Sequence, residues 1–174
     1  SRGAGIGIWS LPLTPETPGR PLKPVEFVDT PSSDGWGVFS PDGHWVAYSS
    51  NESQQFEIYV VPFPGPGGKR QISIAGGIFP RWRQDGKEIF YAGLDGRLMA
   101  ADVTLKASSI DVGQVKPLGI TVPVVLDRRS ATLIVGVPYD VSLDGQRILA
   151  ITEPERSTAI PLTLVQNWVS LLKK

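Results

Sequence analysis

The chain has 174 residues, and its 17 Lys and Arg balance 17 Asp and Glu, so the formal net charge is zero. This balance argues against a binder of nucleic acid or of anionic membranes, which carries a basic excess. The chain has no cysteine and one histidine, which excludes disulfides, thiolate chemistry and the common zinc sites. It also lacks a run of roughly 18 apolar residues, the length that a membrane-spanning helix needs.

The first predicted strands lie at residues 8–13 and 25–28, with a Pro-rich and Gly-rich loop between them. Residues 8–13 (IWSLPL) match residues 58–63 (IYVVPF) in character at each position. This internal similarity indicates that the N-terminal residues form the third and fourth strands of a repeated unit.

Three Asp-Gly pairs then recur along the chain, 43 and 59 residues apart. They are Asp42-Gly43, Asp85-Gly86 and Asp144-Gly145. Each follows a short run that contains an aromatic residue and precedes a compact apolar run, which is the pattern of a β-hairpin. The sequence thus predicts three hairpins, each opening one repeated unit.

Further strands complete the units. Third strands are predicted at residues 57–63, 97–103 and 161–165, and fourth strands at residues 69–73 and 112–118. About 40–45 residues with four strands per repeat is typical of a β-propeller blade. The prediction is therefore an all-β chain that forms a single partial β-propeller of about three and a half four-stranded antiparallel blades. Its parts are a half blade (1–35), two blades (36–77 and 78–118), an insertion (119–138), and a last blade with a C-terminal tail (139–174) that makes a short helical turn.

Four segments resemble WD40-like (TolB-like) β-propeller repeats. They are FSPDGHWVAY (39–48), EIYVVPFPG (57–65), PRWRQDGKEIFY (80–91) and YDVSLDGQR (139–147). The closest similarity is to the C-terminal propeller of large bacterial proteins, which often carry a serine/threonine kinase or DNA-binding domain upstream. The resemblance implies a fold without catalytic residues, because any kinase motifs would lie outside this chain. It also favours an extracytoplasmic location. Since closed propellers usually have 4–8 blades, we expect the chain to be part of a longer protein.

The search for catalytic, cofactor and metal sites yields no candidate. His44 follows a turn and has no Gly-x-Ser-x-Gly nucleophile near it in the sequence. The Gly-rich run at residues 65–70 lacks the spacing and the following helix of a phosphate-binding loop. The single Asp in each turn fits turn geometry rather than calcium binding. Most aromatic residues fall inside strands and are expected in the core.

Arg81 and Arg83 are the candidate ligand-facing residues. Strand alternation places Trp82 on one face of the sheet and both arginines on the other. The first strands of blades line the central channel of a propeller, so the two guanidinium groups could meet an anionic ligand or a peptide carboxylate. The alternative is that they pair with acids of neighbouring blades or lie at a solvated rim.

The function expected from these patterns is a non-catalytic propeller module for protein–protein interaction or sensing within a larger protein. The alternative is a ligand-sensing or regulatory domain of a receptor-like serine/threonine kinase, or the gating propeller of a peptidase. The expected partner is a protein or peptide, including further copies of the chain that bind at open blade faces and edges, at residues 6–28 and 139–165.

Overall fold

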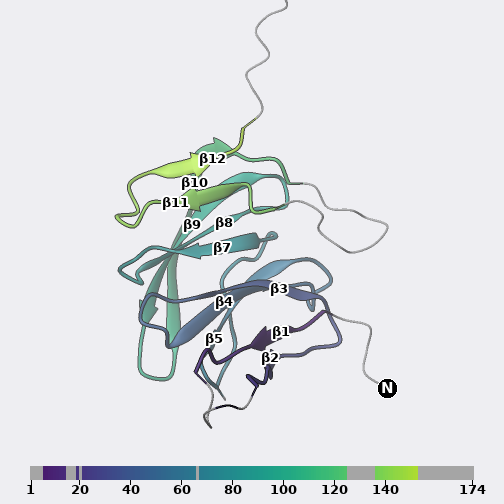
Figure 1. The fold of residues 1–174 in the computed structure, drawn as a ribbon. Coiled ribbons are helices and arrows are strands. Elements are labelled where there is room, and N and C mark those ends of the chain that lie inside the picture. Colours follow the sequence, from purple (N-terminus) through teal and green to yellow (C-terminus); the bar gives the residue numbers. More distant parts are fainter. Residues whose placement is uncertain (1–5, 15–18, 20, 66, 125–135, 153–174) are drawn as a thin grey trace, which may run out of the picture.

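The computed structural model describes residues 6–14, 19, 21–65, 67–124 and 136–152. Within these ranges all secondary-structure elements are β-strands, which confirms the all-β class. The twelve strands form two four-stranded and two two-stranded sheets, all antiparallel (Figure 1). The described part of the chain offers no helix that is long and apolar enough to cross a membrane. The predicted strand at 161–165 and the C-terminal helical turn lie outside the described residues.

Each sheet is built from strands that are consecutive in the chain. The N-terminal sheet pairs β1 (Ile8–Ser10) with β2 (Val25–Val28). The first four-stranded sheet has the order β3 (Asp34–Phe39), β4 (Trp45–Ser50), β5 (Glu57–Pro62) and β6 (Arg70–Gln71). The second has the order β7 (Ile78–Trp82), β8 (Glu88–Ala92), β9 (Arg97–Leu105) and β10 (Ile110–Thr121). The C-terminal sheet pairs β11 (Tyr139–Val141) with β12 (Ile148–Ala150).

The predicted strands that fall within the described residues are found at the expected places, with different lengths at some ends. Strand β1 stops at Ser10, before Pro12, whose missing N–H cannot continue a ladder. Strand β6 is short, although the Ile72 N–H still donates to the Ile58 carbonyl at 2.8 Å. Strand β10 runs through Thr121, past the expected end at residue 118, because its partner β9 is also long.

The three predicted Asp-Gly hairpins share one pairing register. The paired residues are Val38 and Ala47 in the first hairpin, Arg81 and Phe90 in the second, and Asp140 and Leu149 in the third. These pairs are separated by the same 43 and 59 residues that separate the Asp-Gly turns. The hairpins are therefore equivalent parts of one structural repeat.

The turn itself explains why the sequence repeats an Asp-Gly pair. In the first hairpin Gly43 takes φ of 73°, a conformation that glycine adopts without steric cost. The Asp42 carboxylate accepts hydrogen bonds from the Ser40 hydroxyl and from the His44 N–H. These bonds hold the pKa of Asp42 below its ordinary value, the Ser40 bond most strongly. Asp and Gly thus have separate tasks, one in hydrogen bonding and one in backbone conformation.

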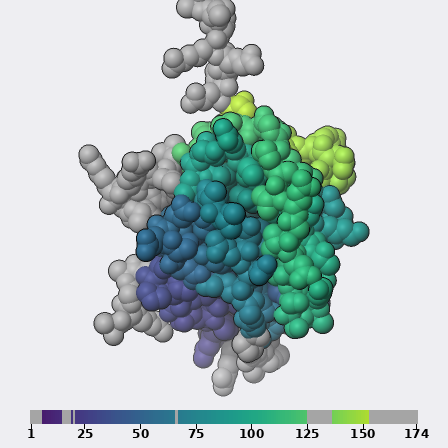
Figure 2. Space-filling view, turned by 180° about the vertical axis from the view of Figure 1, so that it is seen from behind, coloured from purple at the N-terminus to yellow at the C-terminus, as the bar shows by residue number. Residues whose placement is uncertain are grey.

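The sheets stack in chain order, from the β1–β2 sheet to the β11–β12 sheet (Figure 1). The main core lies between the two four-stranded sheets, where Ile58 and Val60 of one meet Ile89 and Tyr91 of the other. Two further apolar clusters join each four-stranded sheet to its neighbouring two-stranded sheet. From behind, β10 forms a green band down one side of the stack (Figure 2). Both faces of the two central sheets are therefore covered by other sheets.

The first strands of the two central sheets meet through aromatic rings. Trp36 and Phe79 occupy equivalent positions and both adopt positive φ, 53° and 59°. Each lies where the ladder of its hairpin is interrupted by a bulge. Their rings pack edge to face with centroids 5.2 Å apart. The bulges thus turn two large rings toward each other at the junction of the sheets.

Candidate functional site

The alternation predicted around Trp82 is confirmed. The Trp82 ring packs on the main core between the central sheets, and its indole N–H donates to the Val38 carbonyl at 3.4 Å. The two arginines lie on the opposite face, toward the C-terminal sheet. The Arg81 Nε lies 3.8 Å from an Asp140 carboxylate oxygen, and the aliphatic stem of Arg83 lies against Gly145.

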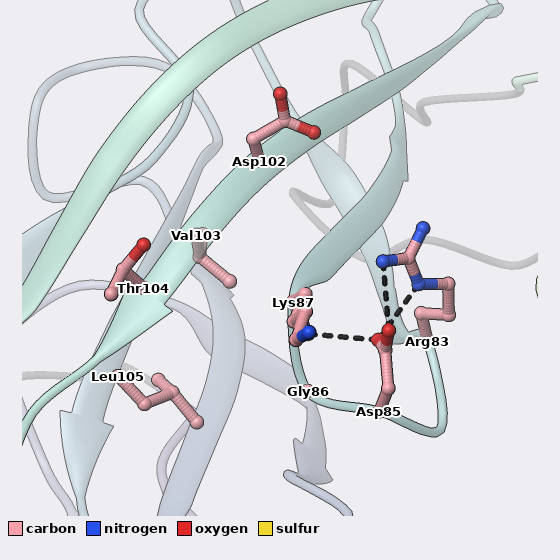
Figure 3. A pocket seen from close by; sticks show the side chains of 8 residues that line it. All are labelled: Arg83, Asp85, Gly86, Lys87, Asp102, Val103, Thr104 and Leu105. Carbon is pink, nitrogen blue, oxygen red and sulfur yellow. Dashed lines mark hydrogen bonds and ion pairs between the residues drawn. The ribbon is translucent and has the colours of Figure 1, made fainter.

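The Arg83 guanidinium is bound by two acids of its own sheet. Its Nε and one terminal nitrogen donate to the two Asp85 oxygens at 2.7 and 2.8 Å, and the other terminal nitrogen donates to Glu88 at 2.8 Å. The bidentate bond to Asp85 is visible in Figure 3. The hydrogen bond to Asp85 raises the pKa of Arg83, and that same bond is the largest cause of the lowered pKa of Asp85. Arg83 thus pairs with acids of its own sheet. The alternative, pairing with an acid of a neighbouring sheet, is matched by the contact of Arg81 with Asp140.

Glu88 links this ion pair to the outer strand of the sheet. Its carboxylate side chain is 8% exposed and binds Arg83 on one oxygen and Lys116 of β10 on the other, at 3.3 Å. A buried carboxylate is stable only when it is paired and hydrogen-bonded. The Arg83–Glu88–Lys116 cluster therefore ties the first, second and fourth strands of the second central sheet together.

An open groove lies beside Arg83, between the second Asp-Gly turn and β9 (Figure 3). Its volume is about 510 Å³. The lining residues are Arg83, Asp85, Gly86, Lys87, Asp102, Val103, Thr104 and Leu105. Two basic and two acidic side chains give the groove no net preference for an anion. The described residues contain no group of three potential metal ligands.

The position of Arg83 in the repeat explains most of its contacts. It is equivalent to Ser40 and Ser142, which precede the other two Asp-Gly turns. The Ser142 hydroxyl donates to Asp144 and accepts the Arg147 N–H at 3.0 Å, as Ser40 does with Asp42 and Trp45. In the second turn the Arg83 guanidinium donates to the turn aspartate in place of the serine hydroxyl. Aligning the SPDG, RQDG and SLDG segments of the sequence would have indicated this equivalence. The ligand-facing role of Arg81 and Arg83 stays a prediction.

An aromatic pocket at the N-terminal end was not anticipated from the sequence. It has a volume of about 170 Å³ and lies where β1 meets the ends of β3 and β5. Phe63 forms its centre, with ring centroids 5.1 Å from Phe27 and 4.9 Å from Phe39. Trp9 and Phe39 are 53% and 56% exposed, so the expectation that the aromatic residues lie in the core is wrong for these two. No charged residue is among those that line the pocket.

Exposed apolar side chains gather on and beside the two terminal sheets, with Phe39 on the adjoining strand β3. Among the described residues, the large ones at the N-terminal end are Ile6, Trp9, Leu11, Leu13, Val25 and Phe39, and those at the C-terminal end are Leu143, Leu149 and Ile151. Ile74 and Val115 are the exceptions, in a loop and on β10. The exposed apolar surface therefore marks the two ends of the stack.

The buried carboxylate of Glu57 is hydrogen-bonded to the loop between the two central sheets. Its carboxylate accepts hydrogen bonds from the Gln55 amide at 2.6 Å, from the Gly76 N–H at 2.9 Å and from the Ser73 hydroxyl. Ser73 and Gly76 belong to the loop that leads from the first central sheet into the second. Glu57 thus anchors this connection.

No protein-family model matches the chain, and no curated protein matches it. The resemblance to WD40-like repeats accordingly stays an expectation from sequence.

Proposed function

We propose that the chain is a non-catalytic, β-propeller-type module that binds protein partners through its two terminal sheets. The proposal is supported by the shared register of the three hairpins and by the stacking of consecutive sheets. Radially repeated four-stranded sheets are the architecture of a propeller, whose rigid blades present surfaces for recognition.

One observation carries the proposal, namely the concentration of exposed apolar side chains at the ends of the stack. Trp9 lies on β1 and Leu149 on β12, and each strand has one neighbour among the described strands. An exposed apolar patch on a soluble protein marks an interaction site, and an unpaired strand edge is a template for another strand. Both features occur together at each end of the stack.

Anion sensing by Arg81 and Arg83 is less well supported. A ligand would have to displace Asp85 and Glu88 from the Arg83 guanidinium, with which both form charge-assisted bonds at 2.7–2.8 Å. The neighbouring groove has as many acidic as basic side chains, so it adds no attraction for an anion that would offset the loss of these bonds. Protein binding needs no such displacement, because the terminal apolar surfaces are already exposed.

Affinity capture with the tagged chain as bait tests this proposal. The matched baits are wild type, Trp9→Lys, Leu149→Lys and Ile74→Lys. Untagged copies of the chain are added to the extract. A charge placed in an apolar interface costs binding, so the terminal variants should retain at least about ten-fold less of the captured proteins. Ile74 is more exposed than Trp9 and Leu149 but lies in the loop between the central sheets. Ile74→Lys should therefore capture as the wild type does.

The proposal is contradicted if all four baits capture the same proteins in the same amounts. Melting curves of the four baits serve as the folding control, since the substituted side chains are exposed and should leave the core unchanged.

A further inference from the structure

We infer that the groove beside the second Asp-Gly turn binds an extended peptide that carries neighbouring residues of opposite charge. The peptide adds a short strand along β9, beyond the point where β8 has ended. The residues that form this site all lie within residues 83–112, in the second central sheet. The site is thus separate from the terminal sheets, and it adds a second binding surface to the proposed function.

The groove exists because β9 and β10 extend further than β8 does. Strand β8 begins opposite Asp102 of β9, and the last bond between them runs from the Val103 N–H to the Lys87 carbonyl at 2.9 Å. Strand β9 continues to Leu105 and stays paired with β10 up to that residue. Beyond Val103, the side of β9 that faces away from β10 has no neighbouring strand among the described residues. The groove lies at this place (Figure 3).

Leu105 presents backbone hydrogen-bonding groups to the groove. The Lys106 N–H donates to the Ser109 carbonyl at 2.8 Å, across the β9–β10 hairpin. Hydrogen-bonded and non-hydrogen-bonded pairs alternate along an antiparallel ladder, so the adjacent pair of Leu105 and Ile110 is of the second kind. The Leu105 N–H and C=O therefore point away from β10, as the Val103 N–H does, and no described residue binds them. Such an unpaired edge is a template for another strand.

Two side chains of opposite charge line the groove without forming an ion pair with a described residue. They are Lys87 and Asp102. The other charged residues of the lining, Arg83 and Asp85, pair with each other at 2.7 Å. The Asp102 carboxylate influences the pKa of Arg83 less than Asp85 and Glu88 do. The groove thus offers one cation and one anion to a ligand.

These two free charges belong to opposite faces of the sheet. Lys87 lies opposite Val103, and Asp102 is the next residue of β9, so strand alternation turns the two side chains to opposite faces. A peptide strand that continues the line of β8 has the same alternation. An acidic residue that meets Lys87 and a basic residue that meets Asp102 must therefore point to opposite faces of the peptide. In so short a site, this means that they are neighbours in its sequence.

The size and chemistry of the groove favour a peptide over a free amino acid or an anion. Its volume of about 510 Å³ is within the range of roughly 300–1,000 Å³ that ligand sites have. A free amino acid carries both charges, but it lacks the amide groups that pair with the N–H and C=O of Leu105. In strand addition the main-chain bonds supply affinity and the side chains supply specificity.

Two capped peptides of the same composition test the inference. Both are acetylated and amidated at their ends, and their sequences are Thr-Val-Glu-Lys-Val-Thr and Thr-Glu-Val-Lys-Val-Thr. Only the first places its two charges on opposite faces of a strand. In amide NMR titrations of the isotope-labelled full chain, the first peptide should shift the Leu105 resonance. It should also bind about three-fold or more tightly than the second, since one exposed ion pair is at stake.

Two variants examine the contacts of the chain itself. Leu105→Pro removes the N–H that points into the groove and none of the N–H groups that bond β10, so the first peptide should bind at least about ten-fold more weakly. Lys87→Glu should weaken it about three-fold or more. Lys23→Glu is the matched control, because it makes the same charge change at an exposed lysine outside the groove. It should bind as the wild type does.

Melting curves of the three variants show whether each is folded, and Lys87→Glu decides the matter if Leu105→Pro is not. The absence of any Leu105 shift, equal binding of the two peptides, or unchanged binding by Lys87→Glu would each overturn the inference. A mixture of free glutamate and lysine that shifts Leu105 as much as the first peptide does would also overturn it, because the groove would then bind the charges without a peptide backbone.

Discussion

The central and the terminal sheets are built from the same repeat, yet they differ in what covers them. Ala47 and Leu149 occupy equivalent places in equivalent hairpins, and the first is fully buried while the second is 80% exposed. The apolar residue at this place is thus part of the repeat in both cases. Among the described residues, Ala47 faces a neighbouring sheet and Leu149 faces none, so a strand sequence that is buried in the middle of the stack is an exposed apolar surface at its end.

The largest contrast is expected from core truncation. Ile58→Ala removes a side chain that is fully buried between the central sheets and should lower the free energy of unfolding by about 2–5 kcal/mol. Leu149→Ala should change it by less than about 0.5 kcal/mol when the protein is dilute, because the side chain is exposed. Urea denaturation at low protein concentration measures both values. Similar losses for the two variants would remove the distinction between central and terminal sheets.

The next effect concerns the loop between the central sheets. Glu57→Ala leaves the Ser73 hydroxyl and the Gly76 N–H without their acceptor, at a cost of about 1–3 kcal/mol for each buried group. Glu52→Ala is the control, because Glu52 is partly exposed and pairs with Lys69 on the surface. Denaturation curves should show a loss for Glu57→Ala that is several times the loss for Glu52→Ala, and equal losses would contradict the anchoring role.

A smaller loss is expected where the C-terminal sheet joins its neighbour. The buried Tyr139 hydroxyl donates to the Phe79 carbonyl at 2.6 Å across the sheet boundary, and burial raises the pKa of Tyr139. Tyr139→Phe keeps the ring and removes this bond, so the free energy of unfolding should fall by about 1–2 kcal/mol. An unchanged stability would mean that the ring alone holds the terminal sheet in place.

The smallest expected effect is a pH dependence of stability that comes from the second Asp-Gly turn. A hydrogen bond from Arg83 lowers the pKa of Asp85 below the ordinary value of 3.8, so the carboxylate stabilises the fold above that pH. This contribution is lost as the pH falls through the lowered pKa. Arg83→Ser installs the residue of the other two turns, and the Asp85 pKa should rise relative to the wild type. Carboxyl carbon NMR shifts follow this titration, and an unchanged Asp85 pKa would contradict the assigned cause.

A double variant tests the ligand role predicted for the arginines. Melting temperatures with phosphate or an acidic peptide should rise for the wild type if the guanidinium groups bind anions, and Arg81→Ala with Arg83→Ala should abolish that rise. The absence of any rise in the wild type would end the prediction.

Much of the fold followed from local chemistry. The Asp-Gly turns placed the three hairpins, because the four-residue turn needs a glycine at positive φ and a carboxylate that binds backbone N–H groups. Alternation correctly sent Trp82 and the two arginines to opposite faces of the sheet. The ion-pair cluster around Arg83 was harder to predict, since Glu88 meets Arg83 from another strand and Lys116 of β10 binds the other oxygen of Glu88.

By itself, the sequence determined the all-β class and the three equivalent hairpins, because turn residues and strand periodicity act over a few residues. Only the tertiary structure decided which equivalent apolar residues are covered. It also decided that Phe27, Phe39 and Phe63 meet Trp9 around one pocket. Burial depends on which sheet lies beside a strand, and that neighbour is set by residues distant in the chain.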